Sequence, residues 1–261
     1  MDLLDGLNPQ QREAVTAGPG PVLVLAGPGS GKTRVLTHRV AYLVREVGVS
    51  PYHILAVTFT NKAAREMRER IQKLLAGQVH GLAIGTFHAM CARLLRREAD
   101  HLPFSRDFVI YDESDQQALV RQALADLNLD EKRYRPASIL AAISKAKNEL
   151  VAPEDYTPAS YYGEVVRRVY ERYQRLLLEN NALDFDDLLM HLVRLFQSHP
   201  EVLAKYQDLY QHILVDEFQD TDPSQYTLLR QLAEKQRNLF VVGDEDQSIY
   251  RWRGADFRNL M

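Results

Sequence analysis

The stretch AGPGSGKT at residues 26–33 joins small residues to a lysine and a hydroxyl, a combination that suits phosphate binding. Small residues let backbone N–H groups curl around phosphate oxygens, and Lys32 can reach the terminal phosphates of a nucleotide. The Thr33 hydroxyl is a suitable ligand for Mg²⁺. The stretch therefore predicts a binding site for a nucleoside triphosphate. The predicted phosphate loop consists of Ala26 (where the usual pattern has a glycine), Gly27, Pro28, Gly29, Ser30, Gly31, Lys32 and Thr33.

Two acids end an apolar run in ILVDEFQD at residues 213–220. A phosphate-loop enzyme needs an aspartate at a strand end to hold the Mg²⁺ shell, and Asp216 is placed for this role. Glu217 is then placed to orient or deprotonate the attacking water. The alternative is that both acids only cap a strand on a solvated edge. Downstream of a phosphate loop, the pair favours hydrolysis over simple nucleotide binding.

A third stretch, GDEDQSIYRWRG at residues 243–254, combines acids with alternating aromatic and arginine residues. Acids suit a metal or a cationic partner. The alternation suits single-stranded nucleic acid, whose bases stack on aromatic rings. The alternative is that Tyr250 and Trp252 are core aromatics of a strand, but flanking arginines disfavour burial of the whole run.

Two other classes of phosphate-loop protein fit less well. A GTPase needs Asn-Lys-x-Asp to recognise guanine, whereas NKAA at residues 61–64 has alanine in place of the aspartate. A small-molecule kinase leaves the aromatic and basic run at 250–253 unexplained.

Short apolar runs separated by amphipathic segments must position these residues. Continuously apolar strands that alternate with helices indicate a parallel sheet covered on both faces, hence an α/β fold. The predicted strands are 21–26, 54–59, 82–87, 212–217 and 238–243, and the first helices are 31–46, 61–75 and 88–99. Asp222, Pro223 and Gln225 predict the start of a later helix.

The middle of the chain, residues 108–183, is helical and poor in strands. Ser114 and Gln117 predict a capping box for its first helix. Because strand and helix alternation resumes afterwards, we expect an inserted helical subdomain between two parts of one nucleotide-binding domain, residues 1–107 and 184–261.

Bulk properties restrict the class of protein. The net charge of −3 gives no global basic field, so any nucleic-acid binding must be local. The single cysteine, Cys91, fits a reducing compartment and is expected to pack in the core. No apolar run approaches the ~20 residues of a membrane span, and the acidic start is not a signal peptide. A cytoplasmic location is expected.

These motifs together resemble the N-terminal half of a superfamily 1 DNA helicase of the UvrD/PcrA/Rep type, over essentially the whole chain. LNPQQREAV (7–15) resembles the adenine-reading Q motif, and VDEFQDT (215–221) and VGDEDQSIYRWRGAD (242–256) resemble motifs II and III. The resemblance implies a RecA-like domain with a helical insertion. It also implies Gln11 and Arg34 at the adenine, Gln247 at the γ-phosphate, and ATP with Mg²⁺ as cofactors.

The same resemblance implies contacts to DNA. FTNKAAREM (59–67) resembles motif Ia and GTFHAM (85–90) motif Ib. The residues implied at the DNA are Phe59, Thr60, Asn61, Thr86, His88, Tyr250, Trp252 and Arg253. Phe59 could instead be a core residue, His88 could merely begin a helix, and Asp184 is favoured as a helix N-cap.

Family members continue into a second RecA-like domain, which supplies arginines that stabilise the charge on the transferred phosphoryl group. We therefore expect this chain alone to be a monomer that binds ATP weakly, hydrolyses it slowly and unwinds nothing. The implied whole protein is a 3′→5′ translocase and helicase on single-stranded and partly duplex DNA, with repair proteins as possible partners. The alternative is an ATP-switched DNA-binding or partner-docking module without motor activity.

Overall fold

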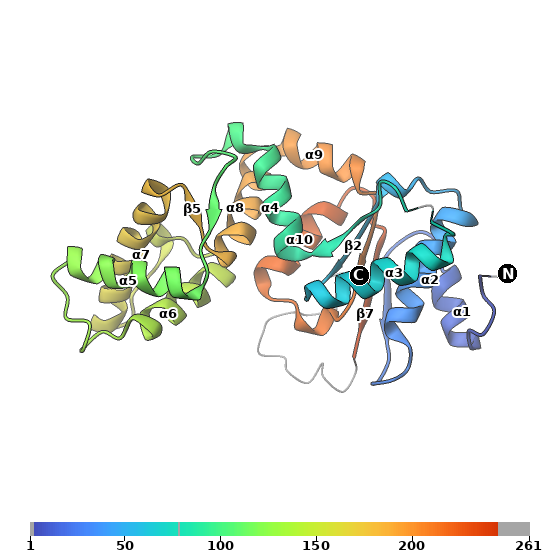
Figure 1. Cartoon of the computed structure of the whole chain (residues 1–261), viewed down its shortest axis with the longest axis horizontal. Helices are drawn as coiled ribbons and strands as arrows, with labels where there is room; N and C mark the ends of the chain where they lie inside the picture. Colours follow the sequence, from blue (N-terminus) through green and yellow to red (C-terminus); the bar gives the residue numbers. More distant parts are fainter. Residues whose placement is uncertain (1–2, 78, 245–261) are drawn as a thin grey trace. The chain divides into compact units, whose positions relative to one another are not determined.

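The computed structural model describes residues 3–77 and 79–244, which form two compact units (Figure 1). The sheet unit contains the described residues up to Ala89 and those from His199 onward. The helical unit contains residues Met90–Ser198. It thus extends on both sides of the predicted 108–183 range, because it includes most of the helix before that range and all of the helix after it.

The sheet unit is built on a five-stranded parallel sheet with the order β1-β7-β6-β2-β3. The predicted α/β class and parallel sheet are confirmed. Each strand lies within one residue run predicted from the sequence. The strands are β1 (Val22–Leu25), β2 (Ile54–Thr58), β3 (Ala83–Thr86), β6 (His212–Val215) and β7 (Leu239–Gly243).

Apolar residues on both faces of the central strands explain why the sheet is covered twice. Ile54 and Ala56 belong to the core cluster formed with α1 (Pro9–Thr16), α2 (Lys32–Arg45) and α3 (Asn61–Leu74). Their neighbours Leu55 and Val57 point to the opposite face, since side chains alternate along a strand, and they are buried too. Helices α1, α2 and α3 lie side by side on one face (Figure 1).

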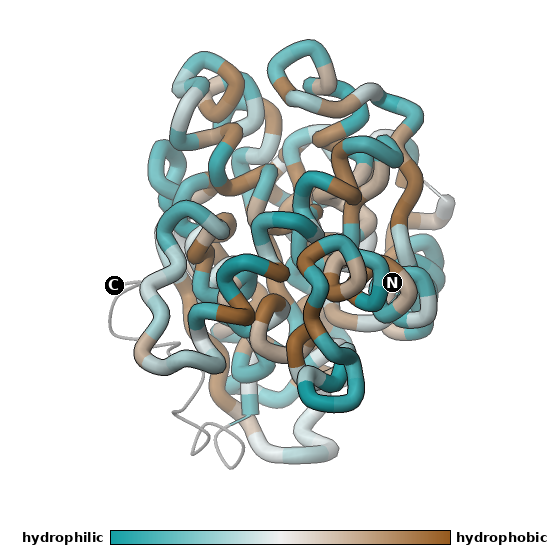
Figure 2. The backbone as a smooth tube through the Cα atoms, turned by 90° about the vertical axis from the view of Figure 1, so that its left-hand side faces the viewer, coloured by the Kyte–Doolittle hydropathy of each residue, from teal (hydrophilic) through white to brown (hydrophobic). Residues whose placement is uncertain are grey.

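The remaining helices of the sheet unit are α9 (Pro200–Leu209) and α10 (Pro223–Ala233), which contact each other. Helix α10 begins as predicted: Asp222 accepts a hydrogen bond from the Gln225 backbone, and Pro223 is its first residue. Figure 2 shows hydrophobic and hydrophilic residues alternating along the helical turns, as amphipathic packing requires. None of the helices formed by the described residues is long and apolar enough to cross a membrane.

The helical unit has its own apolar cluster, which residues between 119 and 182 form. Its helices are α5 (Glu113–Asp126), α6 (Pro136–Asn148), α7 (Tyr161–Glu179), α8 (Phe185–Ser198) and most of α4 (Phe87–Arg97), with a short parallel pair of β4 (Val109–Ile110) and β5 (Ala182–Leu183). Cys91 on α4 is fully buried, in agreement with the packing role predicted.

The predicted capping box of α5 was wrong. The helix begins earlier, at Glu113, and its N-cap is Asp112 in a reciprocal pair with Asp115 rather than Ser114 with Gln117. Aspartate is as good an N-cap as serine, and the earlier start places Glu113 and Asp115 in the first turn, where the helix dipole favours acids.

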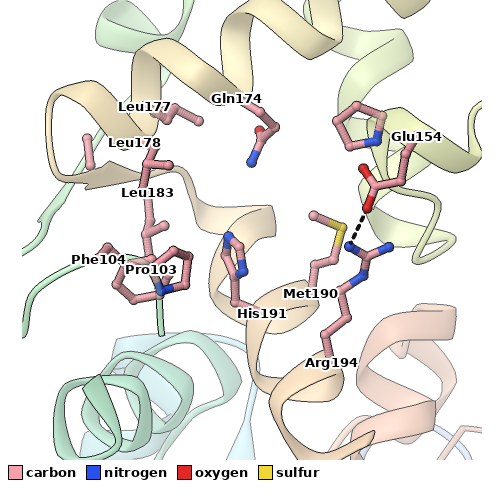
Figure 3. A pocket seen from close by; sticks show the side chains of 12 residues that line it. Pro103, Phe104, Glu154, Gln174, Leu177, Leu178, Leu183, Met190, His191 and Arg194 are labelled. Carbon is pink, nitrogen blue, oxygen red and sulfur yellow. Dashed lines mark hydrogen bonds and ion pairs between the residues drawn. The ribbon is translucent and has the colours of Figure 1, made fainter. Parts of the chain in front are cut away.

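A buried charged network joins α6 to the start of α8. The Lys147 ammonium contacts Asp184 Oδ2 at 2.6 Å and Asp187 Oδ1 at 2.7 Å, and all three side chains are at most 2% exposed. Asp184 Oδ1 accepts the Asp187 N–H, so Asp184 caps α8 as expected. Gln174 donates to Asp187, and it lines a neighbouring pocket with His191 and Met190 (Figure 3).

Candidate nucleotide site at the carboxyl edge of the sheet

The phosphate loop lies between β1 and α2, in the strand–loop–helix setting that phosphate binding requires. Gly29 has φ +74° and Gly31, the N-cap of α2, has φ +87°. Both angles favour glycine. The Ser30 hydroxyl donates to the Gly27 carbonyl at 2.6 Å, which ties the loop to itself. Pro28, Gly29 and Ser30 are exposed, so the loop is open to a ligand.

Lys32 is held by a carboxylate at the end of a neighbouring strand. Its ammonium lies 2.7 Å from Asp244 Oδ2, and the two side chains are 11% and 1% exposed. Strands β1 and β7 are adjacent in the sheet, which brings these residues together although 212 positions separate them. A bound triphosphate would compete with Asp244 for this lysine, because both are anions.

Thr33 and Asp216 meet as the predicted Mg²⁺ ligands should. The Thr33 hydroxyl donates to Asp216 Oδ2 at 3.0 Å, and Asp216 is 3% exposed. Burial raises the pKa of Asp216, partly offset by the hydrogen bond from Thr33. Both side chains offer oxygen atoms, and one of these belongs to a buried carboxylate, so the pair fits a Mg²⁺ ion.

Glu217 adopts an unusual backbone conformation directly after Asp216. Its φ of +53° lies in the left-handed region that favours glycine. The Glu217 N–H donates to Asp216 Oδ1 at 3.1 Å, and the Glu217 carboxylate accepts from Gln219 Nε2 at 2.6 Å. The turn therefore aims two neighbouring carboxylates in different directions, one toward Thr33 and the other toward Gln219.

Gln11 contacts the phosphate loop through its side chain. Its Nε2 donates to the Ser30 carbonyl at 2.9 Å, and its Oε1 accepts the Asn8 N–H at 3.0 Å. Both polar atoms are thus paired within the protein, and the adenine contact remains a prediction. Arg34, the other residue expected at the adenine, is exposed on the first turn of α2.

The residues predicted from motif Ia lie at the carboxyl end of β2. Phe59 is half-buried, with its ring centroid 5.5 Å from that of Phe87. Thr60 is exposed and caps α3 by accepting the Ala63 N–H, and Asn61 is the exposed first residue of that helix. Phe59 therefore keeps a ring surface available while it packs on Phe87.

Motif Ib lies where β3 ends and α4 begins. Thr86 is 7% exposed, and its hydroxyl accepts the Ala89 N–H at 3.2 Å, a helix-capping contact. His88 is partly exposed on the first turn of α4. Because parallel strands end at one edge, Thr86 shares the carboxyl edge of the sheet with Phe59 and Asp216.

Four predicted site residues, Gln247, Tyr250, Trp252 and Arg253, lie outside the described residues. Sequence reasoning did not single out Gln219, which contacts Glu217 and Asp244, and it did not pair Asp244 with Lys32. The available signal was their position, since Gln219 follows the acidic pair by two residues and Asp244 directly follows an apolar strand.

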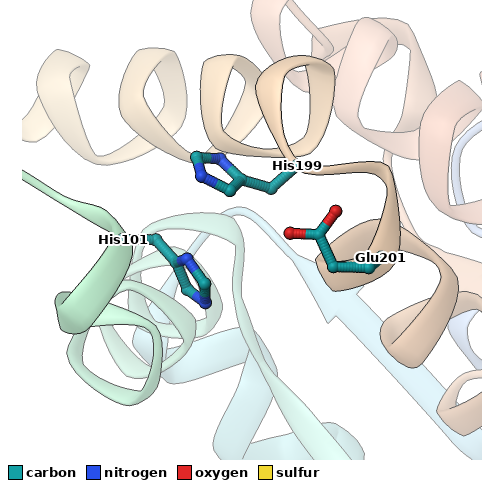
Figure 4. Close-up of side chains that lie close together, drawn as sticks. All are labelled: His101, His199 and Glu201. Atoms are coloured by element: carbon teal, nitrogen blue, oxygen red, sulfur yellow. The ribbon is translucent and has the colours of Figure 1, made fainter.

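His199 and Glu201 lie at the start of α9 in the sheet unit, whereas His101 belongs to the helical unit (Figure 4). We assign no metal-binding role to these residues.

The chain resembles known proteins over its whole length. The family model described as the UvrD/REP helicase N-terminal domain matches residues 7–261. The chain is 54% identical over 261 residues to the ATP-dependent DNA helicase PcrA of Bacillus subtilis, covering 99% of this chain and 35% of that protein. It is 52% identical to PcrA of Staphylococcus aureus and 51% identical to that of Staphylococcus epidermidis, covering 99% of this chain and 36% of each. The chain thus spans about a third of the length of these relatives.

Proposed function

Since the chain belongs to the UvrD/REP helicase N-terminal domain family, we propose that it is the ATP-binding lobe of an ATP-dependent DNA helicase. The observation that carries the proposal is the convergence of Lys32, Thr33, Asp216 and Glu217 at one edge of a parallel sheet. A lysine, a hydroxyl and two carboxylates around an open phosphate loop are the groups that ATP hydrolysis needs.

Each side chain has a separate task in this proposal. Lys32 releases Asp244 and binds the terminal phosphates. Thr33 and Asp216 would hold Mg²⁺, which would neutralise phosphate charge when bound. Glu217 accepts a proton from the attacking water as the water oxygen bonds to the γ-phosphorus and the bond from that phosphorus to the bridging oxygen breaks, so that ADP leaves. Gln11 holds the loop through Ser30 while the nucleotide binds.

The proposed DNA contacts that the structure describes, from Phe59 to His88, lie at the same edge of the sheet. Phe59 offers a half-buried ring beside exposed polar residues, an arrangement that suits stacking with an unpaired base. We propose single-stranded and partly duplex DNA as the substrate, movement in the 3′→5′ direction and a role in DNA repair. The names of the PcrA relatives support DNA as the substrate, and the direction and pathway rest on the motif resemblance.

The test is DNA-stimulated ATP hydrolysis and strand displacement by the full-length protein. Lys32→Ala should abolish hydrolysis and leave single-strand binding intact, while Lys73→Ala, which alters an exposed lysine of α3, should change neither. Retained hydrolysis in Lys32→Ala would refute the phosphate-binding role. Stimulated hydrolysis with no movement or strand displacement would instead support the ATP-switched binding module.

A further inference from the structure

We propose that Gln219 is a positioning residue for the hydrolytic step: it orients the Glu217 carboxylate and ties it to the end of β7. This inference rests on the proposed ATP hydrolysis and adds a residue to it. Gln219 lies on the short 3₁₀ turn Phe218–Asp220, two residues after Glu217.

The Gln219 amide makes two directional contacts. Its Nε2 donates to Glu217 Oε2 at 2.6 Å, and its Oε1 accepts the Asp244 N–H at 3.1 Å. A backbone N–H can only donate and a carboxylate only accepts, so the two partners fix which end of the amide points to which. Neither glutamate nor an apolar residue of similar size can make both contacts.

The turn that carries Gln219 is held rigidly. Phe218 is fully buried, and its carbonyl accepts from the hydroxyl of the fully buried Thr221 at 2.7 Å. The left-handed backbone at Glu217 starts the turn and places its side chain where Gln219 reaches it. One oxygen of the Glu217 carboxylate is thereby engaged, and the other is available to take a proton from water.

The far contact of Gln219 involves a residue that also holds Lys32. Asp244 donates its backbone N–H to Gln219 and accepts the Lys32 ammonium on its side chain at 2.7 Å. The hydrolytic carboxylate and the phosphate-binding lysine are therefore linked through two intermediate residues. A nucleotide that binds Lys32 would draw this lysine away from Asp244. Asp244 is also the residue through which Gln219 ties the orientation of Glu217 to the strand end.

Strand β7 is shaped to allow this contact. A Cβ atom added at Gly243 would lie 3.3 Å from Gln219 Oε1, a close approach. Gly243→Ala therefore displaces the amide by a few tenths of an ångström without changing its chemistry. This variant gives a second, independent perturbation of the same contact.

The test is steady-state ATP hydrolysis by the full-length protein with DNA present, together with binding of a non-hydrolysable ATP analogue. Gln219→Met removes both hydrogen bonds, and Gln219→Glu keeps only the acceptor and adds charge repulsion against Glu217. Both variants should lower kcat by about tenfold or more, because they lose the hydrogen bond that positions the charged Glu217 carboxylate. KM and analogue affinity should stay within about threefold, because that hydrogen bond takes no part in nucleotide binding. Gln72→Met, at an exposed position of α3, is the matched control.

The outcomes separate the two claims. Equal hydrolysis by wild type and Lys32→Ala would overturn the proposed function and this inference with it. An active wild type whose Gln219 variants keep their kcat would overturn the positioning role alone. A parallel loss of kcat, analogue binding and thermal stability would also overturn it, because Gln219 would then only maintain the fold. If Gln219→Met fails to fold, Gly243→Ala decides: a lowered kcat with intact analogue binding supports the role, and an unchanged kcat contradicts it.

Discussion

Replacing Lys147 with methionine would remove one ammonium group from the interior of the helical unit and leave two carboxylates behind. Methionine has a similar length and flexibility, so the change removes charge with little change in volume. Asp184 and Asp187 would then face each other with side chains at most 2% exposed. The Tyr173 hydroxyl and the Gln174 amide, which remain as side-chain hydrogen-bond donors, are neutral, and His191 Nε2 lies 4.0 Å from Asp187 Oδ1.

The contacts of Lys147 set the size of the effect. Breaking a buried ion pair by removing one partner costs about 3–5 kcal/mol, because an uncompensated buried charge remains. Two contacts of 2.6 and 2.7 Å are lost here, so we expect the upper part of that range. A domain stability of about 5–15 kcal/mol would be reduced by a large fraction.

The assay is urea unfolding of the 261-residue chain at pH 8, followed by circular dichroism. Lys145→Met on the same helix is the matched control, since the Lys145 side chain is 77% exposed and lies 4.0 Å from Glu149. The control should change the unfolding free energy by less than about 1 kcal/mol. Equal unfolding midpoints for the two variants would refute the argument that the buried network stabilises this unit.

The loss of stability caused by Lys147→Met should also depend on pH. Burial, followed by the charge of Asp187, raises the pKa of Asp184 to about 6. An acid whose pKa is raised in the folded state contributes fully to folding stability at pH values below its unfolded-state pKa of about 3.9. This contribution is lost as the pH rises through the folded-state pKa. Without Lys147 the carboxylates take up protons more readily. The cost of Lys147→Met should therefore be smaller at pH 5 than at pH 8, and an equal cost would contradict this account.

Two further variants probe the candidate site. Thr33→Val removes the hydroxyl that lies 3.0 Å from Asp216. ATP binding should therefore weaken about tenfold or more with Mg²⁺ and remain unchanged with EDTA. Weaker binding under both conditions would indicate a damaged phosphate loop instead. Phe59→Ala should weaken binding of a fluorescent single-stranded oligonucleotide by about 1–3 kcal/mol in anisotropy titrations. Tyr52→Ala, which removes an aromatic ring that is 52% exposed before β2, is its control, and unchanged affinity in Phe59→Ala would assign that ring to packing on Phe87.

The sequence was sufficient to predict those features that depend on local pattern. Continuous apolar runs determined the strands, since a strand covered on both faces must be apolar at successive positions. Asp222 and Gln225 identified the start of α10 because a capping box is formed by residues three apart. The same local reasoning failed at α5, where Asp112 and Ser114 were both competent caps and the helix begins after Asp112, which pairs with Asp115.

Contacts between distant residues required the tertiary structure. The order of the strands places β7 between β1 and β6, and this order alone brings Asp244 to Lys32 and Gln219 to the end of β7. No spacing in the sequence encodes that order, because it arises from how the helices cover the two faces of the sheet. The burial of Lys147 with two aspartates also could not be read from the sequence, since a lysine on a helix is normally solvated and the packing of α6 against α7 and α8 removes it from water.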